Sequence, residues 1–274
     1  MPWGAAVVAL LLLALPAAAV GQRSAQMPQR VKAERARGLL DVRAEAQATP
    51  AEPSNAQDAL RRSLGLLGVV EVDSLTGTPR VVAKLDGFLT GPSSRDAKDV
   101  ALDYVRAHAD VFLLDAEDLA GLRVTRDYAD IAGIRHLVWA QTAGGIAAFD
   151  NDLRANVTAD GRLLNVLGSP LPDLTDRVAA LAPALDATGA VGAALRSVGR
   201  ELRSPRILSR GLGPKQPTRF AGGHRANLVL FNTPRGVKLA WRATAFADAD
   251  EVYDTVVDAS SGEVLRRVNE VADV

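Results

Sequence analysis

The alternation of apolar and polar residues predicts that the chain is built mainly from β-strands after residue 59. In the first half, strands are expected over residues 69–72, 81–85, 121–128, 134–142, 146–158 and 162–167. In the second half, further strands are expected over residues 226–231, 237–246, 252–258 and 263–268. The Asp160-Gly161 pair lies between two alternating runs, which is a strong hairpin signal.

One amphipathic helix is expected in each half of the chain. The first follows Ser93 and Asp96, which resemble a capping box, and places apolar residues at helical spacing over residues 97–108. The second spans residues 184–198. Because no strand alternates with a crossover helix, the predicted fold class is α+β, with two consecutive domains that each pack a helix on an antiparallel sheet. The Pro-Leu-Pro segment at 170–172 marks the boundary between them.

The N-terminus carries the features of an export signal. Residues 5–20 are uncharged and almost wholly apolar, and residues 17–19 are the small Ala residues that signal peptidase accepts. The stretch is short for a membrane-spanning helix, and no later stretch reaches about 18 uninterrupted apolar residues. We therefore expect a signal peptide over residues 1–21, a secreted protein, and no membrane association after cleavage. Because residues 1–4 contain no Lys or Arg, a mis-assigned start or an uncleaved anchor is the alternative.

Two segments are predicted to lack regular structure. Residues 22–58 are rich in Ala, Arg, Glu, Gln and Pro and hold few large apolar side chains, which predicts a disordered linker. Since this segment has no apolar face with which to grip a partner, removal of residues 22–57 is expected to matter little. Residues 200–223 contain three Pro, five Arg and four Gly and are expected to form a long exposed loop.

Composition narrows the classes of protein that fit. The 32 Lys and Arg residues balance 32 Asp and Glu residues, so the chain lacks the basic field that sequence-independent nucleic-acid binding needs. Hydrophobic residues make up 48% of the chain, which excludes wholesale disorder. The absence of Cys excludes disulfides, thiolate metal sites and thiol nucleophiles.

The sequence contains no familiar catalytic motif. Its three histidines, His108, His136 and His224, lie 28 and 88 residues apart, so none belongs to the H-E-x-x-H pair of a zinc hydrolase. G-x-S-x-G and the nucleotide-binding glycine motifs are also missing. We expect structural or surface roles for the histidines and no catalytic, cofactor-binding or metal-binding residues. The acidic run at 248–251, with Asp254 beyond it, offers oxygens for calcium, but a solvated hairpin turn is favoured because the Gly and Glu of an EF-hand loop are missing.

A recognisable order of motifs runs from residue 134 to residue 168. A strand ends in an aromatic-x-Gln motif, and a Gly turn, an Ile-x-Ala-Phe segment, an alternating strand, an Asp-Gly turn and a return strand follow. This order resembles the fungalysin/thermolysin propeptide (FTP) domain. The residues that carry the resemblance are Trp139, Gln141, Gly145, Ile146, Phe149, Leu153, Val157, Asp160, Gly161, Val166 and Gly168.

The C-terminal half resembles a PepSY domain. A Leu-Ala-Trp-Arg-Ala strand precedes a Val-Asp-Ala-Ser-Ser-Gly-Glu-Val-Leu hairpin, in the order typical of that family. The matching residues, for which structural roles are implied, are Trp241, Tyr253, Asp258, Ala259 and Gly262. The two resemblances imply an FTP-like domain over residues 59–172 and a PepSY-like domain over residues 173–270, with cystatin-like or PepSY-like folds.

This tandem is similar to the pro-region of secreted fungalysin-type zinc metallopeptidases. The resemblance implies a non-catalytic folding assistant and inhibitor whose partner is the cognate catalytic domain, in cis or in trans. Residues 271–274 are expected to be a truncated junction to that missing domain, to which the zinc would belong. The alternatives are a free-standing exported PepSY-type binding or protease-inhibitory protein, and an enzyme whose catalytic carboxylates the sequence does not reveal.

Overall fold

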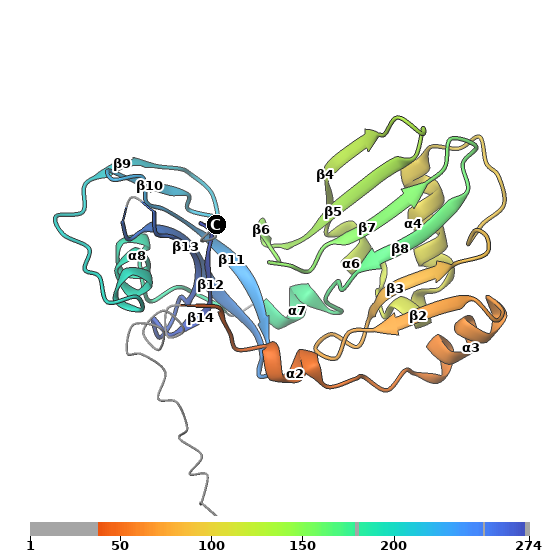
Figure 1. Cartoon of the computed structure of the whole chain (residues 1–274), viewed down its shortest axis with the longest axis horizontal. Coiled ribbons are helices and arrows are strands. Elements are labelled where there is room, and N and C mark those ends of the chain that lie inside the picture. Colours follow the sequence, from red (N-terminus) through yellow and green to blue (C-terminus); the bar gives the residue numbers. More distant parts are fainter. Residues whose placement is uncertain (1–37, 179–180, 249, 272–274) are drawn as a thin grey trace, which may run out of the picture.

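Two antiparallel sheets, each with a helix against one face, lie side by side (Figure 1). The structure is a computed structural model that describes residues 38–178, 181–248 and 250–271. The expected signal peptide at 1–21, the linker up to residue 37 and junction residues 272–274 lie outside the described residues. The predicted α+β class with helices packed on antiparallel sheets is confirmed.

The first lobe consists of a sheet with the strand order β2-β3-β8-β7-β5-β4, the helix that precedes β2 in the chain and the helices that connect β3 to β4. Its strands are β2 (Gly68–Val72), β3 (Pro79–Lys84), β4 (Leu122–Ala129), β5 (Arg135–Ala143), β7 (Leu153–Val157) and β8 (Leu163–Gly168). Its helices are α3 (Asn55–Ser63), α4 (Ala97–Ala107), α5 (Ala109–Phe112) and α6 (Ala116–Ala120). The apolar side of α4, including Tyr104 and Val105, packs with Trp139 in one core.

The second lobe is the sheet in the order β1-β14-β13-β12-β11-β10-β9. Its strands are β1 (Leu40–Asp41), β9 (Ile207–Arg210), β10 (Thr218–Phe220), β11 (Arg225–Thr233), β12 (Gly236–Phe246), β13 (Val252–Asp258) and β14 (Val264–Asn269). Helix α8 (Ala187–Arg196) covers one face, where Val191 and Ala194 pack with Trp241. Helix α7 (Leu174–Val178) lies between the lobes in the chain. No helix in the described part of the chain is long and apolar enough to cross a membrane.

The described part of the expected linker differs from the prediction. β1 pairs with β14 of the second lobe, and α2 (Ala44–Ala48) follows it. Ser54 and Gln57 then form a reciprocal capping box that starts α3. Polar contacts rather than an apolar face hold this segment, so hydrophobic patterning did not detect it. We call residues 38–57 the strap, because Figure 1 shows it running from the second lobe to the first.

Three further expectations are corrected in detail. The helix expected over residues 97–108 spans Ala97–Ala107, but its N-cap is Asp96, which accepts from Lys98 N (2.8 Å), rather than Ser93. The strand expected over 146–158 is broken into β6 (Ile146–Ala147) and β7, because the chain between them crosses to the second lobe. The loop expected over 200–223 contains the short strands β9 and β10, which pair with each other.

Candidate functional site

A buried glutamine near the end of β5 holds the segment that leads from the first lobe to the second. Gln141 is 1% exposed. Its Nε2 donates to Leu171 O (2.6 Å), and its Oε1 accepts from Leu171 N (2.7 Å). The hydroxyl of Thr78 donates to the neighbouring Pro170 O (3.0 Å). Both polar atoms of the amide are therefore satisfied by one backbone position, which fixes where the chain leaves the first lobe.

Asp118 of α6 holds the next two residues of the same segment. Its Oδ2 accepts from Asp173 N (3.0 Å) and its Oδ1 accepts from Leu174 N (3.2 Å). Asp173 has a left-handed backbone (φ 52°), and α7 begins at Leu174. A carboxylate supplied by the first lobe thus satisfies amides at the start of the connecting helix that would otherwise lack partners. Gln141 and Asp118 together clamp the connection.

The turn after β5 projects toward the second lobe. Gly144 and Gly145 both have positive φ (56° and 78°), and β6 folds back against β5. A Cβ on Gly145 would lie 2.7 Å from Pro214 Cγ in the β9–β10 connection. Ile146 packs against the core of the second lobe that α8 covers. The turn therefore needs glycine both for its backbone conformation and for its close approach to Pro214.

Phe149 packs against the face of the second sheet that is opposite α8. Its backbone N donates to Leu230 O (2.8 Å) of β11. Its ring centroid lies 5.8 Å from that of Phe231, within a core on the side away from α8. The guanidinium carbons of Arg242 and Arg266 each lie 5.2 Å from the Phe149 ring centroid. Aromatic packing and cation–π contacts thus attach a residue of the first half to the second sheet.

The strap reaches the same place from the opposite end of the chain. Arg43 is buried, and its guanidinium carbon lies 4.5 Å from the Phe231 ring centroid. Its Nη2 lies 2.7 Å from Asp41 Oδ2 and 3.2 Å from Asp150 Oδ2. Burial opposes ionisation of Asp41, but the contacts with Arg43 outweigh it and lower the pKa of that carboxyl. We call Asp118, Gln141, Gly145, Ile146, Phe149 and Arg43, with their partners, the interlobe joint.

The structure brings four motif residues together at this joint and places the other FTP residues elsewhere. Trp139 lies in the core of the first lobe, while Asp160 and Gly161 form the β7–β8 turn. There Asp160 O accepts from Ser93 N (3.0 Å). Sequence reasoning missed Asp118 and Arg43, because the groups that they bind at the joint, backbone amides in one case and an aromatic ring in the other, are distant in the sequence.

Four of the five PepSY-like residues lie near the start of α8 and the β13–β14 turn, whereas Tyr253 lies at the other end of β13. Trp241 Nε1 donates to Leu185 O (2.8 Å), and Leu185 N donates to Ala259 O (2.8 Å). Tyr253 is buried in β13, and Gly262 ends the turn with φ 77°. These contacts join the helix, the central strand and the hairpin of the second lobe, but they lie outside the interlobe joint.

Asp258 organises that turn. Its Oδ1 accepts from Ser260 N (2.8 Å) and Ser261 N (3.2 Å), and its Oδ2 pairs with Lys238 Nζ. Burial of the carboxyl opposes ionisation, but the Lys238 contact and the Ser260 and Ser261 hydrogen bonds outweigh it and lower its pKa to about 2. The carboxylate is therefore a structural anchor of the hairpin.

The histidines make local contacts. His136 Nδ1 lies 2.6 Å from Asn156 Oδ1 and its Nε2 lies 3.1 Å from Asp130 Oδ2, and hydrogen bonding to both groups raises the pKa of the imidazole. His108 contacts a carbonyl of its own helix, and His224 accepts from a backbone amide. Within the described ranges, no three His, Asp or Glu side chains gather as a metal site would require.

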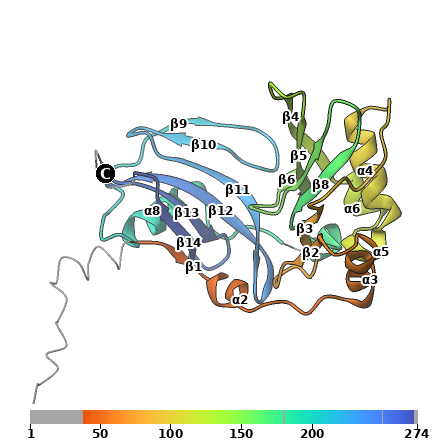
Figure 2. The ribbon, with the colours of Figure 1, turned by 45° about the vertical axis from the view of Figure 1, so that its right-hand side comes forward.

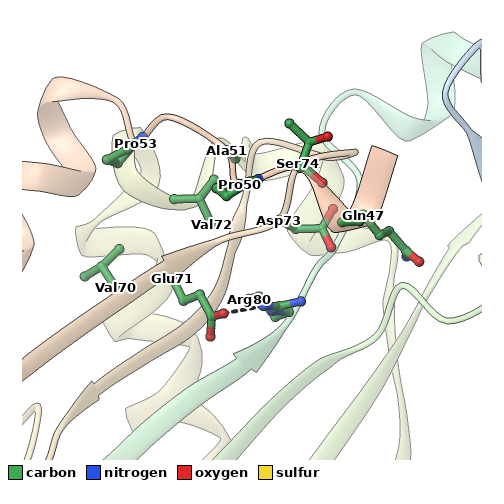
Figure 3. Close-up of a pocket in the computed structure, with 12 residues that line it drawn as sticks. Gln47, Pro50, Ala51, Pro53, Val70, Glu71, Val72, Asp73, Ser74 and Arg80 are labelled. Atoms are coloured by element: carbon green, nitrogen blue, oxygen red, sulfur yellow. Dashed lines mark hydrogen bonds and ion pairs between the residues drawn. The ribbon is translucent and has the colours of Figure 1, made fainter. Parts of the chain in front are cut away.

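A pocket of about 370 Å³ lies between the strap and the β2–β3 hairpin (Figure 3). The strap contributes residues such as Gln47 and Pro50, and the hairpin contributes Val70 and the ion pair of Glu71 with Arg80. Ser74 Oγ donates to the strap carbonyl of Ala46 (2.6 Å) beside it. The pocket results from the strap lying across the hairpin. It contains no histidine and no nucleophile paired with a base.

Comparison with known families places part of the joint, the part on β5 and the segment after it, within a described motif. Residues 120–170 match the Fungalysin/Thermolysin Propeptide Motif (FTP). A search of curated proteins found no match to the chain. The matched range runs from the end of α6 to Pro170 and includes Gln141, Gly145 and Phe149. The chain therefore carries a fungalysin/thermolysin propeptide motif, which supports a metallopeptidase pro-region and is not itself a catalytic motif.

Proposed function

We propose that this chain is the pro-region of a fungalysin/thermolysin-type peptidase that assists folding of the cognate catalytic domain and inhibits it. The match of residues 120–170 to the propeptide motif carries this proposal. The partner is the catalytic domain, acting in cis or in trans, and the zinc belongs to that domain. The chain itself contributes no peptidase residues.

The arrangement of the joint supports a role as a template. Gln141 and Asp118 hold the connection between the lobes, and Phe149 docks one lobe on the sheet of the other. A partner that contacts both lobes then meets surfaces that are already fixed relative to each other. Such preorganisation lowers the entropy lost on binding, which favours both inhibition and templating of a folding intermediate.

The remaining parts of the chain complete the proposal. Residues 173–270 form a PepSY-like domain that contributes the second binding surface. Residues 1–21 form a signal peptide that directs the chain to the extracellular space. The resemblance of the Trp241 strand and of the hairpin around Asp258 to PepSY sequences supports the first statement, and the apolar run at residues 5–20 supports the second.

The proposal is tested by refolding and by inhibition. The denatured catalytic domain of a fungalysin-type peptidase from the same genome is refolded with and without the chain, and the recovered activity is measured. The chain is then titrated against the active enzyme. We expect more recovered activity in the first assay and inhibition in the second.

Two variants show whether the joint matters for this activity. Phe149→Ala removes the ring that docks on the second sheet, whereas Leu66→Ala removes an apolar side chain that is 99% exposed. We expect the first variant to reduce rescue and inhibition and the second to leave both unchanged. Inhibition without rescue favours the free-standing inhibitor. If the chain produces no rescue and no inhibition while the peptidase is active, the proposal is contradicted.

A further inference from the structure

The charge of the chain is balanced overall but not in the segment that contains β9 and β10. Residues 200–225, which we call the basic arm, hold six Arg and one Lys against a single acidic residue, Glu201. The whole chain has 32 basic and 32 acidic residues, so this local excess is not a consequence of composition. A concentrated positive field of this kind attracts and orients an anionic partner.

The basic arm lies at the free margin of the second sheet (Figure 2). β9 is the last strand in the sheet order and pairs only with β10 in the described structure. Because Gly211 N donates to Pro217 O, the alternation of an antiparallel ladder turns the N–H and C=O of Arg210 away from β10. The strand therefore presents backbone hydrogen-bonding groups to an additional strand.

Two arginines of the arm face each other directly. Arg219 of β10 is the cross-strand partner of Arg225 of β11, and both side chains are exposed. Like charges at directly opposed positions destabilise a sheet. Among the described residues neither forms an ion pair, whereas Arg200 at the start of the arm pairs with Asp248 and Glu251. The fold thus keeps a repulsive pair that an external carboxylate would relieve.

Apolar side chains accompany this charge. Leu208 on β9 is 56% exposed, and Leu212 in the turn that follows is fully exposed. Phe220 is buried, and the half-buried ring of His224 packs edge-on against Phe246, so the described arm offers no exposed Phe, Tyr or Trp ring on which a nucleic-acid base would stack. Neither a phosphate chain nor a lipid headgroup supplies the alternating N–H and C=O groups that a strand edge pairs with.

We propose that the β9 edge binds an extended acidic segment of a partner protein by strand addition. The segment pairs with the backbone of β9. Its acidic side chains approach Arg219 across β9 and offset the positive charge that Arg219 shares with Arg225, and its apolar residues cover Leu208. The proposal does not depend on the pro-region function, because it follows from the charge and the free edge alone.

The test uses full-length chain and a synthetic peptide of about eight residues that alternates Glu and Val. Binding is measured by isothermal titration calorimetry at low and high salt. We expect binding that weakens with salt, and a loss of about tenfold in affinity for the double variant Arg219→Gln/Arg225→Gln. The charge-matched control Arg62→Gln/Arg126→Gln, on exposed positions of the first lobe, should bind like the unaltered chain.

Other probes separate strand addition from general anion binding. The same peptide with a central Pro keeps its charge but cannot continue a ladder, and it should bind about tenfold more weakly. Equal affinity for the Pro peptide, or tighter binding of a DNA duplex or of phosphatidylglycerol vesicles than of the Glu-Val peptide, overturns the proposal. No detectable peptide binding at low salt also overturns it.

Thermal unfolding of the Arg219→Gln/Arg225→Gln variant tests whether it is folded. Removal of the Arg219–Arg225 repulsion should leave the thermal midpoint unchanged or higher. A lower midpoint would mean that the two arginines stabilise the fold, which contradicts their proposed role as a site held ready for a partner.

Discussion

Gln141 and Leu171 exchange two hydrogen bonds, one from the Gln141 side-chain amide to the Leu171 carbonyl and one from the Leu171 amide to the Gln141 oxygen. The two residues are 30 positions apart, and both are buried. A motif residue of β5 thereby fixes the backbone at the point where the chain leaves the first lobe. The glutamine serves the connection between lobes rather than the chemistry of a site.

Replacement of Gln141 tests this relationship. Gln141→Ala leaves a buried carbonyl and a buried N–H of Leu171 without their partners, so we expect a loss of about 1–3 kcal/mol in the free energy of unfolding. Gln47→Ala, at an exposed position of α2, is the matched control and should change it by less than about 0.5 kcal/mol. Denaturant unfolding measures both. Equal midpoints for the two variants would mean that the paired hydrogen bonds do not hold the connection.

Two turn glycines that the sequence treats alike should respond very differently. Both have positive φ, 79° at Gly161 and 77° at Gly262. A Cβ on Gly161 would lie 1.9 Å from the backbone O of Ser93, whereas a Cβ on Gly262 would lie 3.9 Å from the nearest atom, Leu185 Cδ2. We expect Gly161→Ala to lose about 3 kcal/mol of stability and Gly262→Ala about 1 kcal/mol. Thermal unfolding of the two variants measures both losses. A larger loss for Gly262→Ala than for Gly161→Ala would contradict the prediction.

Hairpins, strands and core positions that depend on neighbouring residues in the sequence were predictable. Asp-Gly at 160–161 predicted the β7–β8 hairpin, because a tight turn needs a residue that tolerates positive φ. Apolar alternation predicted β11, β12, β13 and β14 to within two residues at each end. Trp139 and Trp241 were assigned to core packing, and both lie in the cores of their lobes.

The joint was not predictable as a site. Asp118 binds backbone amides 55 and 56 residues away. Because every residue except proline carries such an amide, the sequence does not indicate which ones a carboxylate will bind. Arg43 lies in a segment of low hydrophobicity, so its burial against Phe231 had no periodic signal. The break in the strand expected over 146–158 depends on where the second lobe sits, which a local pattern does not contain.

The strap should stabilise the chain, a role that the expectation of a disordered linker over residues 22–58 did not include. Arg43 is buried between Asp41, Asp150 and the Phe231 ring. Arg43→Met keeps much of the side-chain volume but removes the ion pairs, and we expect a loss of about 2 kcal/mol in the free energy of unfolding. Arg62→Met, on the exposed side of α3, is the control. A midpoint unchanged in both variants would mean that the strap contributes no stability.

Asp258 should make the second lobe sensitive to acid. Its folded-state pKa of about 2 lies below the unfolded value of about 3.9, so its contribution is complete above the unfolded pKa and is lost as pH falls toward 2. That contribution is about 2 kcal/mol. We expect the stability difference between the unaltered chain and Asp258→Asn to shrink between pH 5 and pH 2. A difference independent of pH in urea unfolding would show that the carboxylate is not held ionised by its neighbours.

The most direct test of the interlobe joint follows the two lobes separately within one chain. Trp139 is buried in the first lobe and Trp241 in the second, and the chain has one further tryptophan, Trp3. In protein labelled with fluorotryptophan, the ¹⁹F signals of Trp139 and Trp241 report the unfolding of each lobe, and Trp3→Phe assigns the third signal. We predict that both lobes unfold at the same urea concentration in the unaltered chain and at different concentrations in Phe149→Ala. Separate transitions in the unaltered chain would contradict the conclusion that the propeptide motif joins the two lobes into one unit.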